Sequence, residues 1–459
     1  MAKVKKAYFC SSCGYEAPKW LGKCPACNQW NTFTEEVIAH ADDSALSAIA
    51  SDRQSRPMTI DQIEDTVHRR IELGSAEVNR VLGGGMVEGS LVLLGGEPGI
   101  GKSTIALQIA LTSPGLKTLY VSGEESPQQI KMRASRLEGR NGECLIYSET
   151  LLENIIRQAE AVDPDLIVID SIQTIYSQVL DSSAGSVSQI RECATMLLKY
   201  AKTTGTSILL IGHITKDGMI AGPKVLEHIV DVVLQFEGDG NNVYRILRGN
   251  KNRFGAIYEI GVFEMRSDGL AEVANPSEIL LSHYDEPLSG IAVGAAADGI
   301  RPYLIEVQSL VCNAAYGTPQ RSSTGFDLKR LNMILAVLEK RVGMKMYQKD
   351  VFLNFAGGFK VADTGLDLAV AAAIISSYFD RPLTEGVCCA GEIGLSGEVR
   401  PAPRTYQRIL EAARLGFKRI VVSNYYRDNS PLPEGIAVVR VGRIDQIPKA
   451  VFGLSDRDE

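Results

Sequence analysis

The stretch GGEPGIGKST, residues 95–104, decides the fold of this chain of 459 residues. Gly96, four intervening residues, and then Gly101, Lys102 and Ser103 have the spacing of a P-loop, between the apolar run SLVLLGG and the helical pattern TIALQIALTS. In such a loop glycines let backbone amides curl around phosphates, the lysine reaches the β- and γ-phosphates, and the serine hydroxyl binds Mg²⁺. The predicted site for ATP and Mg²⁺ comprises Gly96, Glu97, Pro98, Gly99, Ile100, Gly101, Lys102, Ser103 and Thr104.

Apolar runs on both sides of this loop alternate with helical patterns from Met58 to about Arg266. Besides SLVLLGG, the runs are TLYVSGEE, LIVIDSI, SILLIGH and VDVVLQF, and enough residues for a helix separate them. Near-continuous apolar strands with intervening helices are typical of a parallel sheet that is covered on both faces. The region is therefore predicted to have an α/β fold.

Polar residues at the ends of three strands are candidates to complete the site. Asp170 ends DLIVID, a position from which a carboxylate holds Mg²⁺ through water, although such a residue can also cap a helix. Glu124 directly follows the glycine of TLYVSG, and we take it, rather than Glu125, as the catalytic group that orients the attacking water; an ordinary surface carboxylate is the alternative. His213 ends SILLIGH, where it can sense the γ-phosphate or serve only as a structural histidine.

Four cysteines in the first 27 residues indicate a metal site. Cys10 and Cys13 form one CxxC pair, Cys24 and Cys27 form another, and ten residues separate the pairs. Two such pairs bring four thiolates onto one Zn²⁺ in a tetrahedron that leaves no open position for water, so the predicted role is structural. A redox-active pair with two unrelated cysteines is the alternative.

Aromatic and basic residues share this N-terminal segment. We expect the only tryptophans, Trp20 and Trp30, to pack around it, with stacking on nucleic-acid bases as the alternative. Residues 1–34 carry five lysines against one glutamate, whereas the whole chain has a formal net charge of −7. A local basic module of this kind can meet phosphate although the chain is acidic overall.

The chain is predicted to be globular and to contain several domains. Residues 1–34 hold the metal site, 35–58 form a linker, 59–272 form the nucleotide-binding domain and 273–459 form a separate α+β domain. The last contains two helical patterns, DLKRLNMILAVLEKRV and DLAVAAAIISSYF, and a strand pair around GEIGLSGEV. No apolar run reaches the ~18 residues of a membrane span and no secretory signal is readable, so we expect a soluble cytoplasmic protein without a membrane partner.

Together with a further box, KNRFG at Lys251 to Gly255, these motifs resemble the RadA/Sms family of bacterial DNA-repair proteins, relatives of RecA. The resemblance covers nearly the whole chain: the four-cysteine ribbon, GGEPGIGKST, YVSGEES, KNRFG, and a C-terminal domain similar to that of Lon protease. It implies a RecA-like P-loop ATPase core and a hexameric ring on single-stranded and branched DNA, which performs branch migration of recombination intermediates beside RecA. The alternatives are an ATP-gated DNA-binding scaffold without motor activity and an ATP-dependent protease.

The stretch GNKNRFG, residues 249–255, gains a role from this resemblance. In ring ATPases a neighbouring subunit supplies positive charge to the transferring phosphoryl group, and Lys251 and Arg253 on a rigid turn suit that catalytic task. The flanking glycines free the backbone for the turn, and Asn250 and Asn252 are expected to tie it down by hydrogen bonds to its own main chain. Contact between the same cations and DNA phosphates is the alternative.

The C-terminal domain resembles Lon protease around GEIGLSGEVRPAP, yet both positions of the Lon Ser-Lys dyad differ. The serine position falls on Leu366 and the lysine position on Tyr406, neither of which suits serine-lysine acyl transfer, so we predict a domain without peptidase activity. Its cations form a candidate DNA-binding surface, with solvated surface charge as the alternative. They are Lys345, Lys349, Lys360, Arg381, Arg400, Arg404 and Arg408.

Overall fold

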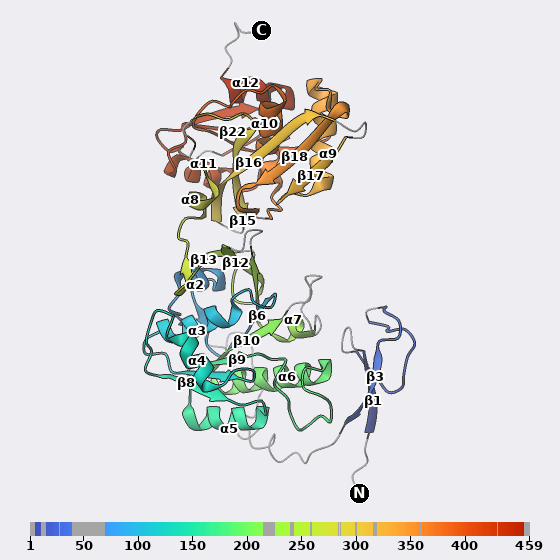
Figure 1. Ribbon diagram of the computed structural model, residues 1–459, viewed down its shortest axis with the longest axis vertical. Coiled ribbons are helices and arrows are strands. Elements are labelled where there is room, and N and C mark those ends of the chain that lie inside the picture. Colours follow the sequence, from blue (N-terminus) through green and yellow to red (C-terminus); the bar gives the residue numbers. More distant parts are fainter. Residues whose placement is uncertain are drawn as a thin grey trace, which may run out of the picture. The chain divides into compact units, whose positions relative to one another are not determined.

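The computed structural model of the protein describes residues 5–10, 15–26, 28–38, 69–213, 225–238, 243–257, 259–282, 284, 286–298, 301–314, 319–358, 360–428 and 430–453. The chain divides after Val273 into two compact units, and Figure 1 labels many of the elements of both. Within the described residues, no helix combines the length and the apolar character needed to cross a membrane.

The first unit is built on a nine-stranded sheet with the order β14-β13-β12-β11-β6-β10-β9-β7-β8. Neighbouring strands run parallel from β11 to β8, which confirms the predicted α/β fold, and the other three strands add an antiparallel edge. The strands are β6 (Leu91–Gly96), β7 (Thr118–Ser122), β8 (Cys144–Ser148), β9 (Leu166–Asp170), β10 (Ser207–His213), β11 (Val232–Gly238), β12 (Tyr244–Asn252), β13 (Ile260–Arg266) and β14 (Gly269–Glu272).

Alternating apolar side chains bury both faces of this sheet. In β6, Val92 and Leu94 join the core on one face, and Leu91 and Leu93 join the core on the other. Helices α2, α3 and α4 supply residues to the first core, and α5, α6 and α7 to the second. The helices are α2 (Ala76–Leu82), α3 (Lys102–Thr112), α4 (Pro127–Ala134), α5 (Leu152–Val162), α6 (Val187–Thr204) and α7 (Val225–Ile229), and a small strand pair joins β4 (Arg70–Ile71) to β5 (Met86–Val87).

The antiparallel edge changes the setting of GNKNRFG. Residues 249–252 belong to β12 and pair with β11, where the register shifts between Val233 and Leu234. The prediction of a turn across the whole stretch is therefore wrong, because its first half is strand. The chain leaves the strand only at Arg253.

The N-terminal segment forms a three-stranded antiparallel sheet of β1 (Lys5–Cys10), β2 (Glu16–Ala17) and β3 (Phe33–Ile38), in the order β2-β1-β3. Its small core contains Cys10, Ala17, Cys24 and Phe33. The two tryptophans, predicted to pack around this segment, both lie beside Gly22, but Trp20 and Trp30 are 51% and 69% exposed and neither joins the core. Strand β3 also occupies the start of the stretch assigned to a linker, of which residues 39–58 lie outside the described part of the chain.

The second unit contains a mixed seven-stranded sheet with the order β17-β18-β16-β15-β19-β22-β23 (Figure 1). Its strands are β15 (Ile291–Asp298), β16 (Arg301–Asn313), β17 (Arg321–Thr324), β18 (Lys349–Phe355), β19 (Val387–Ala390), β22 (Arg419–Ser423) and β23 (Ala437–Val441). An antiparallel pair, β20 (Glu392–Ile393) with β21 (Val399–Arg400), forms around GEIGLSGEV as predicted. The helices are α8 (Pro276–Leu280), α9 (Leu328–Val337), which a π-helical segment (Leu338–Val342) extends, α10 (Asp367–Tyr378), α11 (Thr405–Arg414) and α12 (Ile447–Phe452).

A glycine in β15 allows α10 and the turn before it to lie close to the sheet. A Cβ atom at Gly294 would lie 2.5 Å from Cδ2 of Leu366 and 3.0 Å from Cβ of Ala369. Leu366 is 0% exposed. The position that aligns with the Lon serine therefore carries an apolar side chain that packs onto the sheet.

Candidate nucleotide-binding site

The loop between β6 and α3 holds the residues predicted to bind phosphate. Gly99 and Gly101 have φ angles of +76° and +113°, in the left-handed region that favours glycine. A Cβ atom at Gly96 would lie 2.7 Å from the carbonyl oxygen of Phe236, so a larger residue there would separate β6 from β11. The loop leads into the N-terminus of α3, an arrangement whose amides suit phosphate.

Lys102 begins α3 and turns back into the loop. Its Nζ donates hydrogen bonds of 2.8 Å to the carbonyl oxygens of Gly96 and Glu97, and the residue is 4% exposed. Burial lowers the pKa of Lys102 to about 8, against the opposing effect of the carboxylates of Asp170 and Glu124. These two acidic residues come from separate strand ends, yet both lie near enough to Lys102 to influence its charge.

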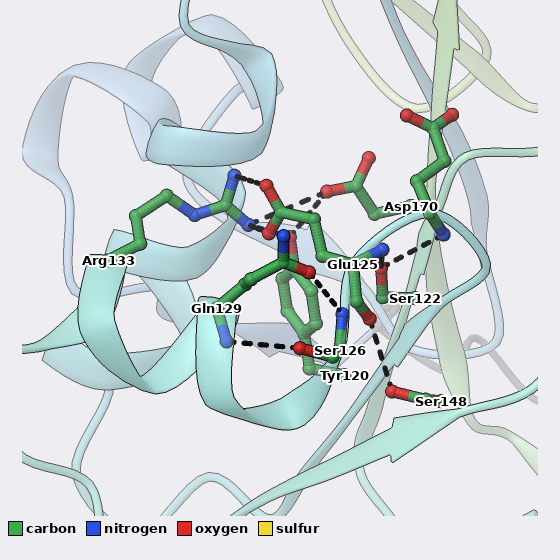
Figure 2. Close-up of polar contacts among 9 residues, drawn as sticks. Tyr120, Ser122, Glu125, Ser126, Gln129, Arg133, Ser148 and Asp170 are labelled. Atoms are coloured by element: carbon green, nitrogen blue, oxygen red, sulfur yellow. Dashed lines mark hydrogen bonds and ion pairs between the residues drawn. The ribbon is translucent and has the colours of Figure 1, made fainter.

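Asp170 ends β9, and Figure 2 shows how its carboxylate is held. Tyr120 on β7 donates a 2.7 Å hydrogen bond from its hydroxyl to Oδ2 of Asp170. The same hydroxyl accepts a 3.4 Å bond from Nη2 of Arg133, which lies 3.9 Å from Oδ2 of Asp170. Burial and the neighbouring carboxylate raise the pKa of Tyr120 well above its usual value, so this hydroxyl stays a donor. The contacts define one orientation for the Asp170 carboxylate.

The two glutamates after β7 have different partners. Glu124 is exposed and accepts a 2.7 Å hydrogen bond from Oγ of Ser171, the residue after Asp170. Glu125 forms a two-point ion pair with Arg133, with Nη1–Oε1 and Nη2–Oε2 distances of 3.2 and 2.8 Å (Figure 2). Glu124 therefore lies beside the end of β9, whereas the carboxylate of Glu125 is engaged by Arg133. This difference favours Glu124 over Glu125 as the group that orients water.

Serine hydroxyls hold the turn that carries both glutamates. Oγ of Ser122 accepts bonds of 3.4 and 3.0 Å from the amides of the first and second glutamate, and Oγ of Ser148 donates a 3.2 Å bond to the carbonyl oxygen of the second. Helix α4 then begins with a capping box in which Ser126 and Gln129 bond each other's main chain (Figure 2). The backbone of the turn is thus fixed at both ends.

Arg245 on β12 supports the P-loop, and sequence reasoning missed it. The residue is 6% exposed, and its Nε donates a 2.9 Å hydrogen bond to the carbonyl oxygen of Ile100. A Cβ atom at Gly101 would lie 3.1 Å from Cε of Met265 on β13. The antiparallel edge therefore packs against the loop, and the only signal for it in the sequence is a cation inside the apolar run YRIL.

Lys251 and Arg253 contact the end of α7 in their own chain. Nζ of Lys251 donates bonds of 2.5 and 2.7 Å to the carbonyl oxygens of Glu227 and Val230, where the helix dipole favours a cation. Burial and the nearby Arg253 lower the pKa of Lys251. Among the described residues, no hydrogen bond or ion pair joins either cation to Lys102 or to the acidic residues beside it.

The two asparagines of GNKNRFG differ in their contacts. Asn252 accepts a 2.9 Å bond from the amide of Phe254, which confirms the predicted bond to the local main chain. Asn250 instead donates a 2.5 Å bond to Oε1 of Gln235 on β11, so the prediction is wrong for this residue. Its strand position directs it to the neighbouring strand.

Asp231 joins this region to the strand that leads into the P-loop. The residue is 2% exposed, and its Oδ2 accepts bonds of 3.1 Å from the amide of Leu91 and 2.8 Å from Nζ of Lys202. Its Oδ1 lies 3.4 Å from Nη1 of Arg253. One buried carboxylate therefore connects KNRFG to the first residue of β6.

The position of Arg408 in the second unit contradicts its assignment to a DNA-binding surface. Arg408 is 1% exposed, its Nη1 lies 2.6 Å from Oδ2 of Asp363, and its Nε donates a 2.9 Å bond to the carbonyl oxygen of Pro403. A buried, paired arginine of this kind is not available to DNA, so its assignment to a DNA-binding surface is wrong. The other cations assigned to that surface are accessible: Lys349 is half-buried, and the exposed ones are Lys345, Lys360, Arg381, Arg400 and Arg404.

Two of the four predicted zinc ligands fall within the described residues. Cys10 and Cys24 are both 0% exposed in the same small core, whereas Cys13 and Cys27 lie outside the described residues. Two buried thiols at equivalent positions of the CxxC pairs fit the donor set of a structural zinc site. His213 ends β10, and its side chain is outside what the structure describes.

Comparison with known proteins gives matches over all three parts of the chain. Residues 55–219 match the AAA domain, residues 8–35 the rubredoxin metal binding domain, and residues 317–425 subunit ChlI of Mg-chelatase. DNA repair protein RadA of Bacillus subtilis is 46% identical over 99% of this chain and 100% of its own length. DNA repair protein RadA of Listeria monocytogenes is 47% identical over 98% and 99%. Among solved structures, a KaiC-like protein from Pyrococcus horikoshii matches with a TM-score of 0.39 and 22% identity, over 45% of this chain and 99% of that one.

Proposed function

Because this chain belongs to the RadA family of DNA repair proteins and contains an AAA ATPase domain, we propose that it is a DNA-dependent ATPase of recombinational DNA repair. Its subunits form a hexameric ring that uses ATP hydrolysis to drive branch migration of recombination intermediates together with RecA. Its partners are single-stranded and branched DNA.

The observation that carries this proposal is the convergence of Lys102, Glu124 and Asp170. They come from the start of α3, the turn after β7 and the end of β9, and both carboxylates act electrostatically on the Lys102 ammonium. ATP hydrolysis requires a cation for the phosphates, a carboxylate for the metal and a group that orients water. This set of three residues supplies one of each.

The roles follow from the contacts. The amides of residues 96–104 bind the triphosphate, and Lys102 neutralises charge on its β- and γ-phosphates. Glu124 orients the attacking water, while Tyr120 and Arg133 hold Asp170 in place. Mg²⁺, held by Ser103 and through water by Asp170, would neutralise negative charge that develops on the phosphate oxygens.

Zn²⁺ is proposed as a structural ion of the ribbon. The match to the rubredoxin metal binding domain and the burial of Cys10 and Cys24 support it. Cys13 and Cys27 complete the set of four thiolates. The ion would supply folding energy to a segment whose own apolar core is very small.

Lys251 and Arg253 act on the ATP of a neighbouring subunit in this proposal. Both cations belong to a stretch that a buried carboxylate connects to β6, which supports a link between this stretch and the P-loop. Contact with DNA phosphates inside the ring is the second role that these cations suit. Mixing Lys251→Ala subunits with Lys102→Ala subunits separates the two roles.

A DNA-binding scaffold and a protease are the two alternative functions, and each would require different properties of this chain. A scaffold without motor activity would bind DNA under control of ATP and move nothing. A protease would need a nucleophile, and the Lon serine position holds the buried Leu366, while Tyr406 donates its hydroxyl to the carbonyl oxygen of Pro431 at 3.0 Å. The exposed cations of the second unit instead suit a DNA-binding surface.

The test measures ATP hydrolysis and strand exchange on the same protein. We expect DNA to stimulate ATP turnover, and we expect labelled branched DNA joints to be extended only with ATP and with RecA present. Lys102→Ala should remove both activities because the phosphates lose their cation. Lys117→Ala, a change outside the site, is the matched control and should keep both.

Ionic strength supplies an independent readout. Counterion release drives most phosphate contact, so DNA affinity should fall steeply as salt rises. Turnover near the wild-type level in Lys102→Ala would overturn the site assignment. DNA-stimulated turnover without any movement of joints would favour the scaffold.

A further inference from the structure

The ribbon carries two exposed indole rings that are neighbours. Trp20 and Trp30 are 51% and 69% exposed, in a chain with no other tryptophan. A Cβ atom at Gly22 would lie 3.7 Å from two atoms of the Trp20 ring and 4.0 Å from an atom of the Trp30 ring. Both rings therefore border the same bare stretch of backbone, which we call the indole face: Trp20, Gly22 and Trp30.

The backbone fixes the position of this face. Lys23 and Trp30 form an antiparallel bridge, and the amide of Asn31 donates a 2.9 Å bond to the carbonyl oxygen of Gly22. The bridge lies just before Cys24, a buried residue of the ribbon core. The rings are thus carried on backbone that the core and the bridge hold, and they add large apolar surface to a module that does not bury it.

Positive charge lies beside one of the rings. Nζ of Lys23 lies 5.7 Å from the centre of the Trp30 ring, and Lys23 and Lys19 are both exposed. Residues 1–38, which include the whole of β3, contain five lysines and three glutamates. A ligand for this face therefore has flat apolar groups and negative charge along its length.

We propose that the indole face binds single-stranded DNA, with unpaired bases stacked on Trp20 and Trp30 and with phosphates beside Lys19 and Lys23. Stacking platforms next to cations are how proteins bind single strands without reading their sequence. Duplex DNA keeps its bases stacked on one another, so it offers this face phosphates alone. The inference rests on the proposed function for DNA as the partner, and adds a site outside the ATPase core.

Binding at the indole face can be followed by the fluorescence of the two tryptophans themselves. Intrinsic tryptophan fluorescence of the full-length, zinc-loaded protein arises only from Trp20 and Trp30. Titration with a thymidine 20-mer should quench it in a saturable way at low salt, whereas a 20-base-pair duplex should quench it weakly. Equal quenching by both DNAs, or none by the single strand, would show that no base stacks on the rings.

Affinity provides the second measurement, by anisotropy of the labelled 20-mer. Trp20→Ala and Trp30→Ala should each weaken binding by about 5- to 150-fold, the range that follows from ~1–3 kcal/mol per stacked base. Trp30→Phe should recover much of the loss because a phenyl ring still stacks. Tyr425→Ala removes an aromatic residue that is 57% exposed in the second unit, and should have no effect of this kind.

The controls separate this inference from the proposed function. Zinc content and the fluorescence of the remaining tryptophan show whether each variant still folds its ribbon. If DNA stimulates ATP turnover but folded Trp→Ala variants bind the 20-mer normally, the indole face serves a different partner and the inference is wrong. If quenching occurs but DNA never stimulates turnover, the proposed function alone fails.

Discussion

Tyr120 sets the direction in which Asp170 presents its carboxylate. Its hydroxyl donates to Oδ2 over 2.7 Å and is buried with it. Removal of a residue that hydrogen-bonds to a metal ligand typically lowers metal affinity about 10- to 100-fold. In Tyr120→Phe we therefore expect Mg²⁺-dependent binding of a fluorescent ATP analogue to need about tenfold more Mg²⁺.

The control for this variant is a buried tyrosine elsewhere. Tyr200 on α6 is 3% exposed, and Tyr200→Phe should leave the Mg²⁺ dependence unchanged. Nucleotide binding measured without Mg²⁺ should be similar in both variants. An unchanged Mg²⁺ requirement in Tyr120→Phe would mean that Asp170 keeps its orientation through other contacts.

Replacement of Arg408 is expected to lower the stability of the second unit. Arg408 is buried and pairs with Asp363, and removal of one partner of a buried ion pair costs about 3–5 kcal/mol. Arg408→Ala should lower the unfolding free energy of this unit accordingly, followed by chemical denaturation. The exposed Lys345, whose φ is −79°, is the control, and Lys345→Ala should stay within about 0.5 kcal/mol of the original protein.

The sequence predicts the site residues that belong to a local pattern. Lys102 follows from the spacing of the P-loop, and Asp170 and Glu124 follow from their places after apolar strands. Tyr120 and Arg245 do not, because their partners lie 50 and 145 positions away in the chain. Arg408 reads as a surface cation for the same reason, since Asp363 is 45 positions away.

Strand β12 places Lys251 beside the end of α7, and this contact gives Lys251→Ala a defined phenotype. The P-loop of the same chain is left intact, so the variant should bind nucleotide and lose motor activity. If Lys251 acts across the subunit interface, mixed rings of Lys251→Ala and Lys102→Ala subunits should regain some ATP turnover. In such rings the intact P-loop of a Lys251→Ala subunit can face the intact Lys251 of a Lys102→Ala subunit.

Basal turnover distinguishes the remaining roles of Lys251. If Lys251 only contacts DNA, the Lys251→Ala variant should keep normal ATP turnover without DNA and lose the stimulation of turnover by DNA. Normal basal turnover together with no recovery on mixing would exclude action across the interface. A variant that no longer binds nucleotide would show that the bonds to Glu227 and Val230 are needed for the fold of the site itself.

The ribbon should depend on its metal. We expect one Zn²⁺ per chain by elemental analysis, and Cys24→Ala should lose it, because a thiolate in the ribbon core is removed. Ribbon folding should fail while ATP turnover without DNA persists, since zinc binding supplies the folding free energy of so small a module. Full zinc occupancy in Cys24→Ala would contradict the ligand assignment.

A strand can be predicted from the sequence where all of its residues are buried. Every residue of β6 and β9 is buried, and both apolar runs are evident in the sequence. In β12 the buried residues lie in its first part, whereas residues 250–252 are exposed or half-buried, and glycine and asparagine near its end favour a turn locally. Pairing with β11 overrides that local preference, so strand propensity alone does not identify it.

The matches to the RadA relatives cover 98–99% of this chain, so these relatives share the sequence of the second unit. We predict no peptidase activity from this unit: incubation of an unfolded protein with ATP and the full chain should give no new fragments. Deletion of residues 275–459 should disturb oligomer size and DNA affinity together. Cleavage that a change in this unit abolishes would overturn the assignment of Leu366 and Tyr406.

The bond between Asp231 and Leu91 offers a way to follow the molecule at work. The amide proton of Leu91 is held by a buried carboxylate that also faces Arg253, so its exchange with deuterated solvent depends on both. Opening free energies vary along a chain, and a single slowly exchanging amide reports the local one. Deuterium uptake at Leu91 would thus register, without any label in the ATP site, when KNRFG changes its contacts.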